Sequence, residues 1–141
     1  MANTFKVISF AAEPASAGTA YTAYTVAGST TTIVLGLRLA NLSGSTVTAE
    51  VEVVSDTGSR GGANNVTNTT SFLVKDAPIP AGGALDVLGT SKVVLETTDA
   101  IKIDCSVADQ LSGTISIMEI TKDGRHYTRC WYHHTVNFNN C

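Results

Sequence analysis

The feature that most constrains this chain is an alternation of apolar and polar side chains with a period of two residues. Thr46 to Val53 shows it most clearly, with valine and alanine on odd positions and glutamate and threonine on even positions. Such a pattern is typical of a strand with one face in a core. Ile33 to Leu39 repeats it, with large apolar residues on odd positions. We expect the two segments to form a hairpin around the Asn-, Ser- and Gly-rich turn from Asn41 to Ser45.

The alternation continues along the chain and is interrupted by turn signals at spacings of about 8 to 12 residues. No window of a dozen residues keeps a helical period, and the high Thr and Val content disfavours helices. The pattern predicts an all-β fold, a single β-sandwich or jelly-roll-like domain. Seven further strands are predicted: Phe5–Phe10, Ala20–Val26, Ser71–Lys75, Ala84–Leu88, Lys92–Glu96, Ile101–Val107 and Gly113–Ile120.

Length and charge limit the organisation and the class of function. A chain of 141 residues is long enough for one domain with a sizeable core and too short for two. We assign residues 1–121 to the sandwich and residues 122–141 to a C-terminal interaction arm. The net charge of −3, without any run of Lys or Arg, argues against nucleic acid as a partner. No apolar run is long enough for a membrane span, and no secretory leader is visible.

Two segments depart from the regular alternation. Asp56 to Asn68, rich in Gly and Asn, is long for a hairpin loop, and we expect a mobile excursion or a contact arm there. The matches to the glycosylation pattern, such as Asn41-Leu42-Ser43, are interpreted as turns. The last twelve residues concentrate the chain's single Trp with two of its three His and two of its three Cys.

Four stretches of strand and turn residues carry a resemblance to a known group of proteins: Tyr24 to Leu37, Leu73 to Gly82, Val94 to Glu96 and Asp99 to Ile103. These stretches resemble small virion proteins of tailed bacteriophages. The resemblance spans roughly Gly18 to Thr121. It implies a β-sandwich with a non-catalytic assembly role in the virion, on the head, neck or tail. We expect a homo-oligomeric capsid decoration or cement protein, with trimeric symmetry as one option, whose other partners include the major capsid protein. A neck, collar or tail component is the alternative.

The cysteines allow two interpretations of the C-terminal segment. Cys105 shares a strand face with Ile103 and Val107, so we expect a buried free thiol. Cys130 and Cys141 remain as a candidate disulfide, within the chain or between subunits, because virions leave the reducing cytosol at lysis. A reduced pair is the plain alternative. Zinc would draw on Cys130, Cys141, His126 and one of His133 and His134, but this spacing matches no standard finger, so no metal or cofactor is expected.

The aromatic residues of the segment predict an interface. Tyr and Trp combine a large contact area with a polar group and concentrate in interface hot spots. The alternative is that they cap the open end of their own sandwich. The candidate interface residues are Tyr127, Trp131, Tyr132, His133 and Phe138.

Two other classes of function place different demands on the sequence. An enzyme would need a site where His126, His133 and Asp123 converge, and no nucleophile motif is present, so no catalytic residues are assigned. A carbohydrate-binding module of a host-recognition fibre would need an exposed aromatic platform, for which Tyr21, Tyr24 and Trp131 are the candidates.

Overall fold

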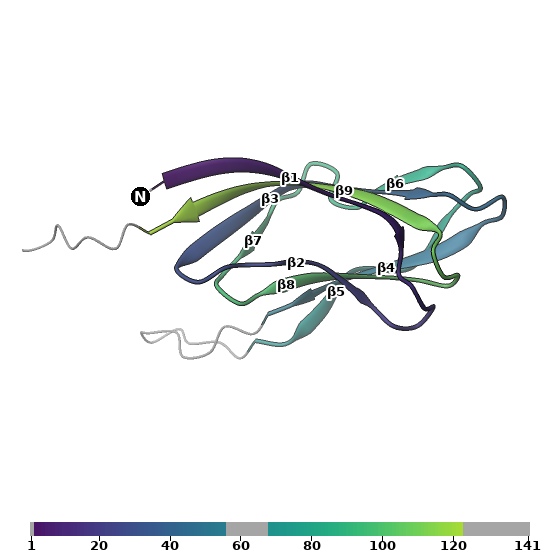
Figure 1. The fold of residues 1–141 in the computed structure, drawn as a ribbon, viewed down its shortest axis with the longest axis horizontal. Helices are drawn as coiled ribbons and strands as arrows, with labels where there is room; N and C mark the ends of the chain where they lie inside the picture. The colour runs from purple at the N-terminus through teal and green to yellow at the C-terminus, as the bar shows by residue number, and fades with distance from the viewer. Residues whose placement is uncertain (1, 56–67, 123–141) are drawn as a thin grey trace, which may run out of the picture.

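The structure is a computed structural model that describes residues 2–55 and 68–122. These residues form nine strands in two antiparallel sheets, which face each other as the two layers of Figure 1. The predicted β-sandwich is therefore confirmed. The strands are β1 (Ala2–Glu13), β2 (Tyr21–Thr25), β3 (Thr30–Asn41), β4 (Val47–Val54), β5 (Thr70–Ile79), β6 (Ala84–Asp86), β7 (Val93–Leu95), β8 (Ala100–Cys105) and β9 (Leu111–Thr121).

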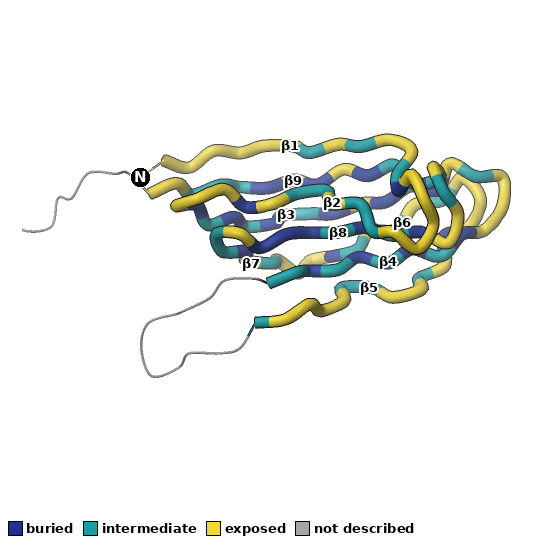
Figure 2. The backbone as a smooth tube through the Cα atoms, turned by 60° about the horizontal axis from the view of Figure 1, so that its bottom comes forward, coloured by how far each residue is buried: buried dark blue, intermediate teal, exposed yellow. Residues whose placement is uncertain are grey.

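The strand order places the most buried strands at the centre of each sheet. The first sheet, here called sheet A, has the order β1-β9-β3-β6, and β7 pairs with another part of β3. The second, sheet B, has the order β2-β8-β4-β5. Figure 2 shows the consequence, since β9, β3, β8 and β4 are largely buried whereas the edge strands β1 and β5 are mostly exposed.

The core lies between the two sheets and is built from the inward residues of the central strands. Burying one Val, Leu or Ile side chain stabilises a fold by about 1.5–3 kcal/mol. Sheet A contributes Val34, Leu37, Leu39, Leu111, Ile115 and Ile117, and sheet B contributes Val47, Ala49, Val51, Ile101 and Ile103.

The predicted hairpin between Ile33–Leu39 and Thr46–Val53 is wrong. These segments belong to β3 and β4, which lie in different sheets: β3 pairs with β9, β6 and β7, and β4 pairs with β5 and β8. The turn from Asn41 to Ser45 therefore crosses from one layer to the other. Alternation shows that each strand has a buried face, but it cannot tell whether two such faces lie side by side or opposite each other.

Asn41 holds this crossing in place. Its side chain is buried, and its amide nitrogen donates to the carbonyl oxygens of Ser45 (2.8 Å), Ile79 (2.9 Å) and Pro80 (3.1 Å). Its Oδ1 accepts from the backbone N–H of Ser43 at 2.8 Å. The interpretation of Asn41-Leu42-Ser43 as a turn is thus confirmed, because both polar atoms of Asn41 are used inside the fold.

A bulge changes the alternation within β3. The pairing with β9 shifts between Val34 and Gly36, so one extra residue is accommodated there. Val34 and Leu37 are buried, whereas Ile33 and Leu35 are only half-buried. The prediction that the odd positions face the core is therefore correct only after the bulge, since an inserted residue reverses the faces of all residues before it.

The edge strand β1 pairs with β9 along almost its full length, from Ala2 opposite Thr121 to Phe10 opposite Gly113. The ring of Phe10 lies directly over Gly113, where an added Cβ would come within 2.3 Å of it. Phe10 also contacts the ring of Tyr21 in β2, with ring centroids 5.3 Å apart. Phe10 therefore joins the edge of sheet A to the edge of sheet B.

Candidate functional site

Apart from Lys122, the residues assigned to the C-terminal interaction arm lie outside the described part of the chain. The assignments on these residues, including the candidate disulfide, the interface and the zinc alternative, stay predictions. They concern Asp123, His126, Tyr127, Cys130, Trp131, Tyr132, His133, His134, Phe138 and Cys141. The contact arm predicted from Asp56 onward also lies outside the described residues, apart from Asn68.

Cys105 is the cysteine that the described residues contain, and it is a buried free thiol as predicted. It shares the inner face of β8 with Ile101 and Ile103. Val107 does not extend this face, because β8 ends at Cys105 and Val107 is 44% exposed. The prediction for Val107 was wrong because the chain turns after Ser106, where alternation no longer applies.

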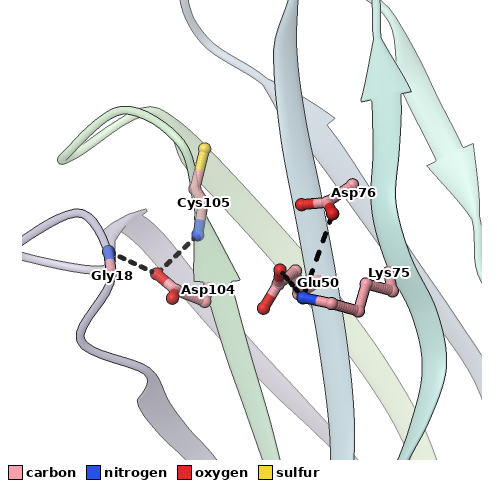
Figure 3. A network of polar contacts seen from close by, with 6 residues as sticks. All are labelled: Gly18, Glu50, Lys75, Asp76, Asp104 and Cys105. Atoms are coloured by element: carbon pink, nitrogen blue, oxygen red, sulfur yellow. Dashed lines mark hydrogen bonds and ion pairs between the residues drawn. The ribbon is translucent and has the colours of Figure 1, made fainter.

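A polar cluster on sheet B is the first candidate site (Figure 3). We use this name for Gly18, Glu50, Lys75, Asp76 and Asp104. Lys75 reaches from β5 to Glu50 of β4, donating to Oε1 at 2.5 Å, and its Nζ lies 3.9 Å from Asp76. Asp104 accepts from the backbone N–H of Gly18 at 3.1 Å and of its own neighbour Cys105 at 2.8 Å.

The polar cluster borders a shallow depression of about 160 Å³, between the Gly18 turn and strands β4 and β8. Glu50 and Asp104 are register partners there, and like charges in directly opposite positions repel. The ammonium group of Lys75 offsets the negative charge of Glu50, and the two backbone N–H groups stabilise the carboxylate of Asp104. The hydrogen bond to Glu50 raises the pKa of Lys75, whereas a lysine that serves as a base or nucleophile needs a lowered pKa. The cluster is therefore organised as a structural ion pair.

Among the residues that the structure describes, no group of three or more His, Cys, Asp or Glu is placed to hold a metal ion. These residues also contain no helix that is long and apolar enough to cross a membrane.

A second cluster joins the two sheets, and we call it the inter-sheet cluster. Its members are Tyr24 of β2, Thr32 of β3, Glu119 of β9 and Lys6 of β1. The Tyr24 hydroxyl donates to Glu119 Oε2 at 2.7 Å and lies 2.7 Å from the Thr32 hydroxyl. Lys6 Nζ lies 2.6 Å from Glu119 Oε1.

The protonation states of this cluster follow from its contacts. Burial, together with the hydrogen bond to Glu119, raises the pKa of Tyr24 to about 12. Hydrogen bonds from Lys6 and Tyr24 lower the pKa of Glu119. A neutral phenol thus donates to a carboxylate over a wide pH range. This arrangement suits a link between the sheets, because each polar group is already satisfied by another member.

Two of the three aromatic residues considered for a sugar platform lie in the described part of the chain. The ring of Tyr21 is half-buried against Phe10, and the hydroxyl of Tyr24 is held by the inter-sheet cluster. Tyr24 is therefore used inside the fold, whereas Tyr21 also lines a depression of about 210 Å³ together with Glu13, Ser16 and Thr19. The carbohydrate-binding interpretation stays a prediction.

The outer faces of the two sheets differ in their chemistry. Sheet B carries charges in register, with Glu52 opposite Lys102 beside the pair of Glu50 and Asp104. In the strands of sheet A, the charged residues that point outward are Arg38 and Asp86, and these two are register partners. The outward positions of β9 are uncharged: Ser112, Thr114, Ser116, Met118 and Ile120.

One line of apolar side chains crosses the outer face of sheet A, and we call it the outer row. The register places Phe5 of β1 opposite Met118 of β9, Met118 opposite Ile33 of β3, and Ile33 opposite Val94 of β7. Phe5 is 71% exposed and Val94 is 62% exposed, whereas Met118 and Ile33 are half-buried. The outer row is therefore a continuous apolar strip on a face whose charged strand residues are Arg38 and Asp86.

Sequence reasoning missed the outer row for two reasons. The bulge in β3 concealed that Ile33 points outward, and the pairing of β1 with β9 cannot be derived from alternation within either strand. One signal was available in the sequence. Phe5 and Val7 stand on odd positions of this strand, whereas Ile8 and Phe10 stand on even positions. This arrangement predicts a strand that is apolar on both faces.

Comparisons with protein-family models, with curated proteins and with solved structures found no significant match to this chain.

Proposed function

We propose that this chain is a non-enzymatic structural protein of a tailed-bacteriophage virion, an oligomeric capsid decoration or cement protein that works through subunit contacts. The resemblance of its strand and turn segments to small virion proteins supports the virion part of the proposal. The organisation of both polar clusters as internal links is in keeping with a binding rather than a catalytic role.

The observation that carries the proposal is the open edge of sheet A. β1 has twelve residues, and nine of them, from Ala2 to Phe10, pair with β9 without interruption. Its burial pattern is exposed at nearly every position. The outer edge of such a strand presents backbone N–H and C=O groups that another strand can pair with.

Natural sheets protect their edges with charges, prolines or bulges, and β1 has little of this protection over Ala2–Phe10. The bulge lies beyond Phe10, and the stretch contains no proline. Its one charge, Lys6, is paired with Glu119 and is the single protecting charge on these nine residues. β1 therefore has the properties of a contact edge between subunits.

The edge is tested with Val7→Lys/Ser9→Lys, which places two charges on exposed positions of β1. The matched control is Ser116→Lys/Thr114→Lys, since these residues are the register partners of Val7 and Ser9, on the same face and one strand further in. We expect the β1 variant to shift the oligomer to monomer in analytical ultracentrifugation, while the control remains oligomeric. A wild-type chain that is monomeric at all concentrations, or equal loss in both variants, would contradict the edge contact.

The virion role is tested by immuno-electron microscopy of particles, with antibodies raised against the purified chain. Regular labelling of the head supports a decoration or cement protein. Labelling at the neck, collar or tail supports the alternative location. Particles that contain no copy of the chain by mass spectrometry would contradict the proposal.

A further inference from the structure

We propose that the outer row is the docking surface for the C-terminal segment of the same chain, residues 123–141, and that the aromatic side chains of this segment cover it. The inference goes beyond the proposed function, because it holds whether or not the chain belongs to a virion.

The first argument is the exposure of the outer row. Phe5 and Val94 form its two ends and are both more than half exposed, although they are large apolar side chains. Ile120, two residues from Met118 on β9, and Val7, two residues from Phe5 on β1, widen the strip on the same face. Contiguous apolar surface of this kind marks a contact site in a soluble protein.

The second argument is where the described chain ends. β9 carries Met118 and ends at Thr121, so the outer row lies only a few residues before the exit of the chain. The backbone N–H of Lys122 donates to the carbonyl of Ser29 at 2.9 Å, which fixes this exit at the same end of sheet A. Nineteen residues follow Lys122 in the sequence. At about 3.3 Å per residue they span up to about 60 Å, against about 15 Å for four adjacent strands.

The third argument is the direction that the sequence favours after the exit. Asp123-Gly124 is a strong signal for chain reversal. A reversed segment cannot pair with β9, because β1 and β3 already occupy both of its edges. Since the outer edge of β1 is proposed above as a contact between subunits, the route that we infer passes over a face of sheet A. The inner face is filled by the core, so the outer face is the one that is open.

The fourth argument is composition. The segment carries Tyr127, Trp131, Tyr132 and Phe138, a high density in a chain that is 6% aromatic overall. Aromatic side chains bury a large area at a low cost in conformational entropy. Tethering beside the outer row gives the segment a high effective concentration there, which favours its own chain over a neighbouring copy.

Trp131 is the single tryptophan of the chain, so its fluorescence reports on the segment alone. The test is the emission maximum and the acrylamide quenching of the full chain over a range of protein concentrations. The variant Phe5→Thr/Val94→Thr removes both ends of the outer row. The matched control, Phe72→Thr/Val107→Thr, removes one exposed Phe and one exposed Val elsewhere, and all four residues are at least 44% exposed.

We expect Trp131 to be shielded from acrylamide in the wild type at every concentration. In the outer-row variant its emission should shift to longer wavelength and its quenching should rise, while the control remains like the wild type. A solvent-exposed Trp131 in the wild type would overturn the inference, as would shielding that the outer-row variant does not reduce. Shielding that develops only as copies associate would also overturn it and assign the surface to a neighbouring copy.

Discussion

At the scale of single residues, close contacts between the two edges of the sandwich depend on Gly113. Its position in β9 is buried under the ring of Phe10, which in turn contacts Tyr21. The absence of a side chain at this residue lets the ring lie against the backbone. Glycine is therefore required here by close approach, not by an unusual backbone angle.

We expect Gly113→Ala to lower the free energy of unfolding by about 1–3 kcal/mol, the usual range for overpacking a filled site. The new Cβ would come within 2.3 Å of the Phe10 ring and force it away from Tyr21. Urea denaturation provides the measurement. Gly36→Ala is the matched control, because nothing lies within 4 Å of a Cβ at that position of β3. A similar loss in both variants would show that the effect is one of strand propensity rather than packing.

At the scale of elements, the positions of the strands could be predicted well and their partners could not. All nine predicted segments overlap an observed strand, and the central strands β3, β4, β8 and β9 bury one face, which alternation reports directly. The assignment of β3 and β4 to different sheets depends on Asn41, whose contacts with Ile79 and Pro80 are distant in sequence. The outward position of Ile33 depends on the bulge at Leu35, for which the sequence carries one signal, the glycine at position 36 inside the strand.

The same distinction applies to the candidate sites, where local properties could be predicted from the sequence and long-range contacts could not. The buried thiol of Cys105 could be predicted, because the face of β8 is a local property. The outer row could not, since it is assembled from four strands through their pairing. The inter-sheet cluster was missed for the same reason: Lys6, Tyr24 and Glu119 are brought together by the packing of β1, β2 and β9.

The inter-sheet cluster predicts how stability depends on pH. Glu119 has a lowered pKa in the folded state. Its contribution to the free energy of unfolding is therefore present above the ordinary pKa of 4.5 and is lost as the pH falls below this value. Because the pKa of Tyr24 is raised from 10.0 to about 12, its contribution is present below pH 10 and is lost as the pH rises toward 12. The cluster should therefore stabilise the protein most at neutral pH.

The measurement is the urea midpoint as a function of pH for the wild type, Tyr24→Phe and Glu119→Gln. We expect the urea midpoint of the wild type to exceed that of Tyr24→Phe by less above pH 10. We expect it to exceed that of Glu119→Gln by less below pH 4.5. Comparing each variant with the wild type at the same pH removes the contribution of the titrating groups outside the inter-sheet cluster. A difference that stays constant over the whole range would exclude the linkage.

At the scale of the whole molecule, the sandwich has one charged outer face and one that is almost free of charge. Sheet B presents its ion pairs to solvent, whereas sheet A presents small polar residues, the outer row and an open edge strand. We therefore expect contacts with other chain segments or subunits on sheet A rather than on sheet B. The polar cluster on sheet B then serves to keep that face solvated.

The cysteines supply a prediction at this scale. We expect Cys130 and Cys141 to form disulfides between subunits after exposure to an oxidising medium, because Cys105 is buried and leaves these two as the reactive pair. Denaturing electrophoresis of alkylated protein should show a ladder of covalent oligomers without reductant and a single band with it. Cys130→Ser and Cys141→Ser should each shorten the ladder. A single monomer band in every lane would count against covalent bridging.

The pairing of β1 with β9 also has a mechanical consequence. Ala2 lies opposite Thr121, so both ends of the sandwich emerge at the same end of one antiparallel pair, as Figure 1 shows. A force that pulls these ends apart would load the backbone hydrogen bonds between β1 and β9 one after another, so they would break in sequence from this end. A force along β1 against the rest of sheet A would load the whole ladder at once. The domain should therefore yield easily to tension between its termini and resist shear along its sheets.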